Sequence, residues 1–186
     1  MNPLFIILLV VVVVLALWLI GTFNSLVRMR NRMKEAASDI EVQSKRRFDL
    51  IPNLVETVKG YAKHEEGVFT KVTEARAAVA SASGSVTQKA GAENMLSDTL
   101  KSLFAVSESY PELKANANFL ELQRELSDTE NKMMASRRFY NNTVNDLNTK
   151  IETFPTNLIA GMFGFKQGTL FATTKQEENE PVSVKF

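Results

Sequence analysis

The first hydrophobic pattern along the chain is an unbroken apolar run. Every residue from Leu4 to Ile20 is apolar, and the uncharged stretch extends through Phe23 until Arg28 brings the first charge. A helix from Pro3 to Phe23 would be ~30 Å long, which matches the hydrocarbon core of a bilayer. We therefore expect residues 1–23 to form a membrane anchor.

A cleaved signal peptide is the competing interpretation of this run. Such peptides begin with basic residues, contain a shorter apolar segment and end at a small-residue cleavage site. Here no lysine or arginine precedes the run, the run is longer, and no such site follows it. These features favour an anchor that is retained.

The rest of the chain has the hydrophobic period of helices. From Leu54 to Val79, steps of four and three residues place mostly apolar side chains on one stripe. Ser81–Gly91 loses this period and is rich in serine, alanine and glycine, which predicts a loop. A shorter helix is expected from Asn94 to Tyr110, and Pro111 should stop it.

The longest predicted helix runs from Asn118 to Thr153, with Asn118 as N-cap and Glu121 three residues later. It would be ~54 Å long, and only Leu26–Ala82, bent or broken at Pro52, is long enough to pair with it. The stripes hold small and polar residues and few leucines, which suits a bundle. We predict an all-α fold, in which a transmembrane helix precedes an elongated, coiled-coil-like antiparallel bundle of three or four helices.

The pattern changes again after Pro155. Asn157–Phe165 is apolar and interrupted by Gly161 and Gly164. The large apolar residues of this segment can cover one end of the bundle, contact another subunit or enter the membrane face, and the sequence leaves these alternatives open. These residues are Leu158, Ile159, Met162, Phe163 and Phe165.

Charge is concentrated just behind the apolar run. The net charge is only +1, but residues 28–47 carry seven basic and three acidic side chains. Because basic residues beside an anchor stay in the cytoplasm, we expect the N-terminus outside the cell and residues 24–186 in the cytoplasm. The basic residues nearest to the run are Arg28, Arg30, Arg32 and Lys34. The expected domains are an anchor (1–23), a cytoplasmic bundle (24–165) and an extended tail (166–186).

The segment KRRFDLIPN, at residues 45–53, combines cations, an acid and a proline within a helical pattern. Pro52 lacks an N–H and clashes with the carbonyl of Phe48, so the helix should end or kink there. The cations would then suit the end of one helix and Asp49 the start of the next. The residues of this expected joint are Lys45, Arg46, Arg47, Asp49 and Pro52. Lipid binding is the alternative, but a straight helix would hold these cations ~33 Å from the interface, several times the ~8 to 10 Å Debye length.

Motifs for catalysis and ligand binding are sparse. The chain has no cysteine, and its one histidine, His64, lacks the second histidine of a helical zinc site. No glycine-rich phosphate loop, nucleophile elbow, acidic metal cluster or DNA-binding motif occurs. We therefore predict a protein with no enzymatic activity, no cofactor and no nucleic-acid partner, and with His64 on its surface.

Four segments resemble the LemA family of bacterial membrane proteins. They are KRRFDLIPNLVETVKGYAKHE, AVSESYPELKANANFLELQRELSDTE, RRFYNNTVNDLNTKIETFPTNLIAGMFGF and the ending PVSVKF. The resemblance covers nearly the whole chain in the same order. It implies a single-pass inner or plasma membrane protein with a cytoplasmic helical bundle. It implies no established activity, although some relatives are associated with the formation of internal membrane compartments.

Two classes of function follow from these features. The first is a non-enzymatic scaffold, held in the lipid bilayer, that forms a homo-oligomer through its bundle and organises or shapes the membrane. The second is an anchored adaptor or regulator that recruits a cytoplasmic or membrane protein. The scaffold predicts a particle larger than a monomer in detergent, and the adaptor predicts a specific heterologous partner.

Overall fold

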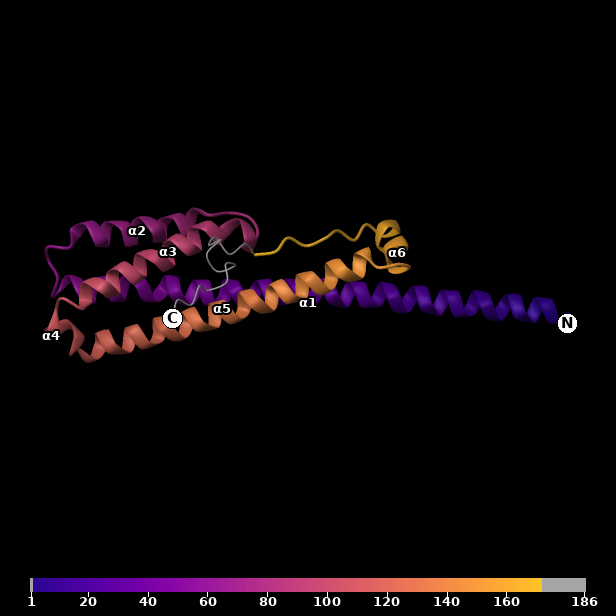
Figure 1. Ribbon diagram of the computed structural model, residues 1–186, viewed down its shortest axis with the longest axis horizontal. Helices are drawn as coiled ribbons and strands as arrows, with labels where there is room; N and C mark the ends of the chain where they lie inside the picture. Colours follow the sequence, from indigo (N-terminus) through magenta and orange to yellow (C-terminus); the bar gives the residue numbers. More distant parts are fainter. Residues whose placement is uncertain (1, 172–186) are drawn as a thin grey trace, which may run out of the picture. The chain divides into compact units, whose positions relative to one another are not determined.

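The computed structural model describes residues 2–171, and this part of the chain is helical without any strand. The helices are α1 (Pro3–Lys59), α2 (Glu66–Ser81), α3 (Val86–Ser107), α4 (Pro111–Lys114), α5 (Ala117–Glu152) and α6 (Thr156–Met162) (Figure 1). The predicted all-α class with a long apolar N-terminal helix is confirmed. Most of the predicted extended tail lies outside the described residues.

The described residues pack into two compact units. The α2–α3 unit consists of Ser38–Arg137 together with Phe171, and the α6 unit consists of residues 2–37 and Arg138–Leu170. Helices α1 and α5 each contribute a segment to both units. This division reflects which residues pack together, whereas the predicted domains separate the chain by expected role into anchor, bundle and tail. The predicted limits at residues 23 and 165 therefore stay predictions.

Four helices share the core of the α2–α3 unit. Helices α2 and α3 lie side by side and antiparallel in Figure 1. Their buried side chains meet those of α1 and α5, and burying each large apolar side chain contributes about 1.5–3 kcal/mol. The larger members of this core are Ile51, Leu54 and Val58 of α1, Phe69 and Val72 of α2, Leu96, Leu100 and Leu103 of α3, and Phe119 and Leu126 of α5. The unit is thus a four-helix arrangement, at the upper end of the predicted range.

The chain turns between α1 and α2 at residues 60–65, not at Pro52. These residues begin with a glycine, which costs about 1 kcal/mol relative to alanine inside a helix. The amides of Tyr61 and Ala62 both bond back to the carbonyl of Val58, at 3.0 and 2.9 Å, and close the turn. The stripe predicted as one continuous helix therefore belongs to two helices, whose apolar residues meet in one core.

Helix α1 runs through Pro52 because another helix satisfies the carbonyl that the proline leaves free. Pro52 has no N–H for the carbonyl of Phe48, and Arg76 of α2 donates its Nε–H to this oxygen at 3.1 Å instead. The Arg76 guanidinium also lies 3.6 Å from the centroid of the Phe48 ring. An interior proline costs about 3 kcal/mol, and a hydrogen bond from a charged donor offsets about 1.5–3 kcal/mol of it.

Of the two alternatives predicted at Pro52, an end or a kink, the helix end does not occur, since α1 continues to Lys59. The cations at 45–47 and the acid at 49 consequently lie inside a helix, away from the dipole of either end. A role of Pro52 as a joint that aims the bundle stays a prediction.

Local caps set the remaining helix ends. Helix α3 begins at Val86 rather than Asn94, because a serine–glutamine capping box precedes it and shortens the predicted loop. Helix α5 lies within one residue of both predicted ends. Its N-cap is Asn116, whose Oδ1 accepts the amide of Phe119 at 3.0 Å. The predicted cap, Asn118, already lies in the first turn of the helix.

The α6 unit has a smaller core of its own. Leu26 of α1, Leu147 of α5 and Ile159 of α6 are buried together, and Leu19 packs against their margin. Helix α6 therefore packs near the turns of α1 from Leu19 to Leu26, which include the end of the apolar run and the residues just after it. This contact places α6 at one defined height along α1.

Residues 166–170 return along α5 as a strap within the α6 unit. The Asn148 side chain holds both backbone groups of Gly168, donating to its carbonyl at 3.0 Å and accepting its amide at 2.8 Å. The Tyr140 hydroxyl donates to the next carbonyl, also at 3.0 Å. A Cβ at position 168 would lie 2.7 Å from the Met33 sulfur. A larger residue at position 168 would therefore require the Met33 side chain to shift.

Candidate functional site

An arginine lies inside the core of the α2–α3 unit. Arg47 of α1 has a side chain only 1% exposed. Its Nη1 lies 2.7 Å from both the Glu130 carboxylate of α5 and the Ser97 hydroxyl of α3. Its Nη2 hydrogen-bonds to the carboxylate of Glu93 and to the carbonyl of the same residue at 3.3 Å. One guanidinium thus ties three helices together.

Two serine hydroxyl groups donate further hydrogen bonds to the carboxylates that pair with Arg47. Ser44 of α1 donates to the Glu93 carboxylate, and Ser97 donates to the second oxygen of Glu130 at 3.2 Å. We define these five residues, Ser44, Arg47, Glu93, Ser97 and Glu130, as the Arg47 cluster. It is a polar network that reaches from the buried Arg47 and Glu93 to the half-buried Glu130.

Burial dominates the electrostatics of the Arg47 cluster. Burial is the largest influence on the pKa of Arg47 and lowers it, the Glu130 carboxylate raises it, and the nearby Arg137 guanidinium lowers it again. Burial also lowers the pKa of Arg137. An arginine guanidinium is not deprotonated in proteins, so burial is a cost that the partners of these charges have to offset. A buried charge of this kind is tolerated only while its partners are present.

The Arg47 cluster is built for holding helices rather than for reaction chemistry. It contains no histidine, and each carboxylate next to a serine is held by Arg47, so no chain of nucleophile, base and orienting group is formed. Residues 2–171 also contain no group of three side chains suited to holding a metal ion. His64 is exposed in the turn after α1, as predicted. The absence of enzymatic activity and of a cofactor stays a prediction.

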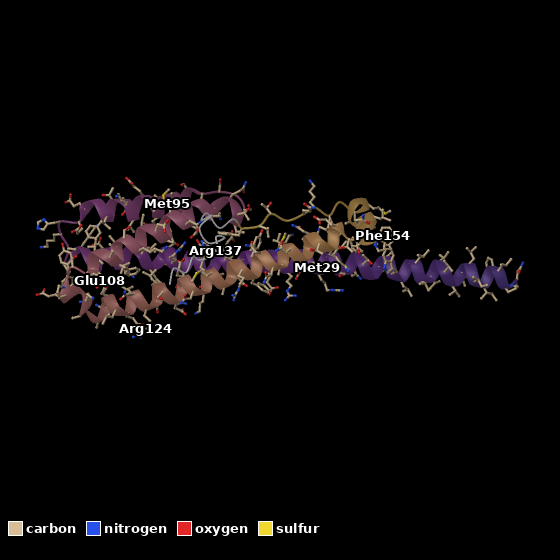
Figure 2. The ribbon with its side chains drawn as sticks, viewed as in Figure 1. Met29, Met95, Glu108, Arg124, Arg137 and Phe154 are labelled. Atoms are coloured by element: carbon tan, nitrogen blue, oxygen red, sulfur yellow. The ribbon has the colours of Figure 1, made fainter. Side chains whose placement is uncertain are left out.

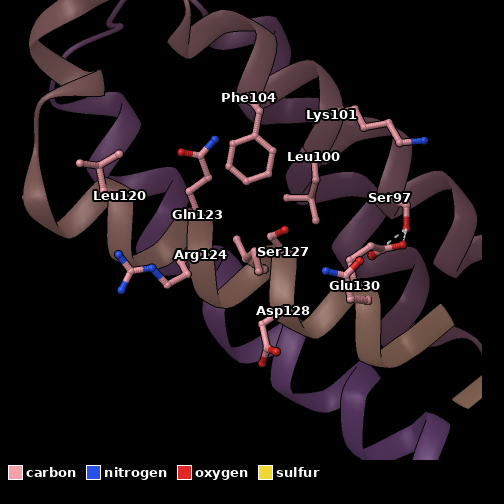
Figure 3. Close-up of a pocket in the computed structure, with 12 residues that line it drawn as sticks. Ser97, Leu100, Lys101, Phe104, Leu120, Gln123, Arg124, Ser127, Asp128 and Glu130 are labelled. Atoms are coloured by element: carbon pink, nitrogen blue, oxygen red, sulfur yellow. Dashed lines mark hydrogen bonds between the residues drawn. The ribbon is translucent and has the colours of Figure 1, made fainter. Parts of the chain in front are cut away.

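A groove opens beside the cluster, between α3 and α5 (Figure 3). It has a volume of about 800 Å³. Ser97 and Glu130 belong both to the cluster and to the groove wall, and in Figure 3 Phe104 of α3 faces Gln123 of α5. The remaining wall combines apolar residues with charges of both signs, namely Leu100, Lys101, Leu120, Arg124, Leu126, Ser127, Asp128 and Asn131. The groove thus has an apolar floor and a mixed charged rim.

The other members of the predicted joint lie on the surface of α1. Lys45 and Asp49 pair with each other at 2.9 Å across one turn. Arg46 reaches to α5, where it lies 3.3 Å from Glu125 and 3.6 Å from Asp128. The three consecutive cations therefore have separate partners: one pairs within its helix, one pairs across to α5, and one is buried.

The four basic residues behind the apolar run are exposed on α1 in the α6 unit: Arg28, Arg30, Arg32 and Lys34. The Arg30 guanidinium lies 5.2 Å from the centroid of the Phe165 ring, and that of Arg32 lies 5.4 Å from the Phe139 ring. These are distances at which cations and aromatic faces attract. The role of the four residues in membrane topology stays a prediction.

The five predicted contact residues near α6 divide into two groups. Ile159 is buried, and Phe165 is partly buried with its ring 5.8 Å from that of Phe23. Leu158, Met162 and Phe163 are 61%, 73% and 48% exposed, respectively. Two members therefore cover the core of the α6 unit, while three leave apolar surface open.

The sequence patterns did not identify Glu93, Glu130 or Arg76 as partners. A signal existed for the first, since extending the stripe of Leu96 and Leu100 back by three residues reaches Glu93. In the same way the stripe of Ile51 and Leu54 reaches Arg47. Opposite charges at stripe positions of two helices indicate a buried ion pair. No comparable signal exists for Arg76, because its partner is a backbone carbonyl.

One described helix is long and apolar enough to cross a membrane. The N-terminal part of α1 reaches a mean hydropathy of 3.4, and none of that segment is buried against the rest of the chain. An exposed apolar surface of this length in water would be strongly unfavourable. It is the surface expected of a segment that lies in lipid.

Comparisons with known proteins give matches over most of the chain. A family model described as LemA family matches residues 36–186. Protein LemA of Metamycoplasma hominis is 27% identical over 158 residues, covering 85% of this chain and 72% of that protein. Magnetosome protein MamQ 1 of Paramagnetospirillum magneticum is 24% identical, and Magnetosome protein MamQ of Magnetospirillum gryphiswaldense is 23% identical, both over 178 residues. The matches cover 82% of this chain and 65% of each MamQ protein, so the chain spans just under two thirds of their length.

Proposed function

The chain belongs to the LemA family, and we propose that it is a non-enzymatic membrane scaffold that self-assembles through the groove of its α2–α3 unit. The apolar run of α1 holds the protein in the bilayer, and the assembled copies organise or shape the membrane around them. Relatives that bear the name of magnetosome proteins support a role at a specialised membrane.

The groove between α3 and α5 is the observation that carries this proposal. Its apolar floor is open, and Leu120 on its wall is 46% exposed. In a two-fold interface the same patch serves both copies, so a surface that offers both a hollow and a projecting apolar side chain can complement itself. We assign a second copy of this chain as the occupant.

The charges on the rim suit a contact between identical copies. Lys101 of α3 and Arg124 of α5 supply positive charge to the rim, and Asp128 of α5 supplies negative charge. Lys101 and Arg124 pair only with exposed carboxylates of their own helices, at 3.2 Å each. Such exposed pairs contribute about 0–1 kcal/mol, so exchanging them for partners in another copy costs little. The net charge of +1 also gives little repulsion between copies.

We propose that the α2–α3 unit lies in the cytoplasm and the N-terminus outside the inner membrane, on the strength of the basic residues at 28–34. The chain has no native cysteine, so single cysteines introduced at Asn2 and at Met95 can each be tested with an impermeant maleimide on intact cells. The Asn2→Cys variant should be labelled, and Met95→Cys only after lysis. Labelling of Met95→Cys on intact cells would show the opposite orientation.

Self-assembly is tested on the full-length protein in mild detergent by light scattering after size exclusion. The native chain, with a monomer mass of 20.8 kDa, should give a multiple of that mass. Leu120→Arg places a charge on the groove wall and should shift the protein to monomer. Met134→Arg is the matched control, since Met134 is exposed on the same helix but does not line the groove.

A strictly monomeric native protein would overturn the scaffold. An unchanged mass for Leu120→Arg would show that the copies assemble through a surface other than the groove. The second candidate, an anchored adaptor, is favoured by the same groove and has a different expected result. The native protein would be monomeric, and a photo-cross-linker at position 120 would capture one heterologous protein that Met134 substituted in the same way does not.

A further inference from the structure

Helix α6 is apolar on two sides. Ile159 and Ala160 are buried in the core of the α6 unit, while Leu158 and Met162 are exposed on another side. Phe154 lies in the turn between α5 and α6 and is 75% exposed (Figure 2). Side chains four apart share one face of a helix, and a helix that is apolar all round belongs in a core or a membrane.

The height of α6 along α1 is fixed by direct contacts. The ring of Phe163 lies 4.9 Å from that of Phe23, edge to face. The core of the α6 unit also reaches back to Leu19, inside the apolar run. From Leu19 to Phe23 a helix rises ~6 Å. The exposed apolar residues of α6 therefore flank this single turn of α1.

This turn of α1 coincides with the boundary of the bilayer. A helix starting at Pro3 needs to continue to about Phe23 to cover a hydrocarbon core of ~30 Å. The headgroup layer beyond it is ~5 to 8 Å deep on each side. A segment packed against Leu19 and Phe23 cannot stand clear of that layer when the run is in lipid.

The charge pattern around α6 matches the same boundary. Residues 153–165 carry no charged side chain. Arg28 and Arg30 are exposed on α1 beyond Phe23, and the Arg30 guanidinium lies 5.2 Å from the centroid of the Phe165 ring. Apolar residues followed by cations are the arrangement of segments that lie in the headgroup region.

We propose that Phe154, Leu158, Met162 and Phe163 form a membrane-seated foot, which enters the headgroup–acyl boundary of the bilayer that α1 crosses. The inference rests on the membrane anchor of the proposed function, and is independent of self-assembly and of orientation. The occupant of the exposed face is lipid, because the contacts with α1 bring it to the lipid boundary. The foot holds the α6 unit to the membrane surface at a second point beside the anchor.

Tryptophan fluorescence in full-length, vesicle-reconstituted protein tests the foot. Trp18 is the only tryptophan of the chain, so Trp18→Phe provides a silent background. In that background Met162→Trp reports on the foot, and Met95→Trp reports on an exposed methionine of α3 (Figure 2). The vesicles contain phosphatidylcholine and phosphatidylglycerol, with or without bromine on the acyl chains near the headgroup.

Bromine should quench the emission of the Met162→Trp variant roughly twofold, and this emission should be shifted to the blue, because an interfacial face lies ~5 to 10 Å into the boundary. The Met95→Trp variant should keep its intensity. Leu158→Trp provides a second reporter on the same face and should behave as Met162→Trp does. Circular dichroism of each variant should be unchanged, because the replaced side chains are exposed.

The native protein separates failure of the foot from failure of the anchor. If Trp18 of the native chain is quenched but the reporters of Met162→Trp and Leu158→Trp are not, the anchor holds and the foot is overturned. If Trp18 is not quenched either, the anchor itself fails. A blue-shifted but unquenched emission from Met162→Trp would mean that protein, a second copy included, covers the face, and this too would overturn the inference.

Discussion

In the α2–α3 unit the side chains of Arg47 and Glu93 are only 1% and 4% exposed, whereas in the α6 unit Leu158 and Met162 are 61% and 73% exposed. Charged residues are ordinarily outside and large apolar residues are commonly inside. The α2–α3 unit departs from this rule by burying charged residues, and the α6 unit departs from it by exposing apolar ones. The departures also differ in how they are compensated.

Charge inside the α2–α3 unit is compensated by the unit itself, since each charged group of the Arg47 cluster has a partner within the core. Apolar surface on α6 has no such compensation within its own unit, because Leu158 and Met162 remain open there. A buried charge therefore reports on how the helices are fixed to one another. An exposed apolar face reports on the surroundings in which the protein works.

The sharpest test of the first half of this comparison is Arg47→Ala. It leaves the carboxylates of Glu93 and Glu130 without their cation, and should lower the free energy of unfolding by about 3–5 kcal/mol. Urea unfolding of the full-length protein in detergent, followed by circular dichroism, measures it. Arg46→Ala removes only exposed ion pairs and should cost about 0–1 kcal/mol. Equal losses for the two variants would contradict the internal role of Arg47.

A second charged group acts inside the same unit by capping a carbonyl. Arg76→Leu should cost about 1.5–3 kcal/mol, the contribution of a hydrogen bond from a charged donor. In a Pro52→Ala background the new N–H can bond the Phe48 carbonyl, so the same substitution should cost much less there. A double-mutant cycle by urea unfolding measures the coupling. Additive losses would show that Arg76 does not compensate for Pro52.

The strap of the α6 unit is held by a group that should make stability depend on alkaline pH. Burial raises the pKa of Tyr140, whose hydroxyl donates to the strap. With the folded pKa above the unfolded value of about 10, the stabilisation is present below that value and is lost as pH rises through the folded pKa. Unfolding curves measured on both sides of pH 10 should show this loss in the native chain. The loss should be smaller in Tyr140→Phe, and an identical pH dependence would contradict the assignment.

The smallest expected effect concerns the exposed face of α6. Leu158→Ser should change the free energy of unfolding in detergent by less than about 0.5 kcal/mol, as for surface positions generally. Ile159→Ser, at the next position but buried, should cost several kcal/mol through lost burial and an unpaired hydroxyl. Similar losses at both positions would show that Leu158 belongs to the core and would remove the contrast between the two units.

Helix α5 shows what periodicity can predict. Its apolar stripe is long and unbroken by proline, so both ends are predicted to within one residue. Pro52 is a strong local signal for a helix end or a kink, whereas the group that compensates for it, Arg76, bonds a carbonyl 28 residues away in the chain. Sequence rules that consider only neighbouring residues predict the energetic cost of a proline in a helix. They do not predict a side chain of another helix that offsets this cost.

The site was predictable only in part. The stripe positions of Arg47 and Glu93 carried the information for a buried pair, but neither residue's burial could be established before α1 and α3 were seen to pack together. The apolar segment after Pro155 was recognised as a contact region. Its division into buried Ile159 and exposed Met162 depends on which side of a short helix faces Leu26, and periodicity over seven residues cannot fix that orientation.

The bond between Arg76 and the Phe48 carbonyl has a consequence for the order of events during synthesis. The ribosome adds Pro52 before Arg76, and at ~5 to 20 residues per second the 28 positions from Phe48 to Arg76 take roughly 1 to 6 s. During that interval the turn of α1 around Pro52 has no donor for its free carbonyl other than water. The last turns of α1 are therefore completed only when α2 arrives, and the nascent chain keeps a soft point between its first apolar segment and its future core.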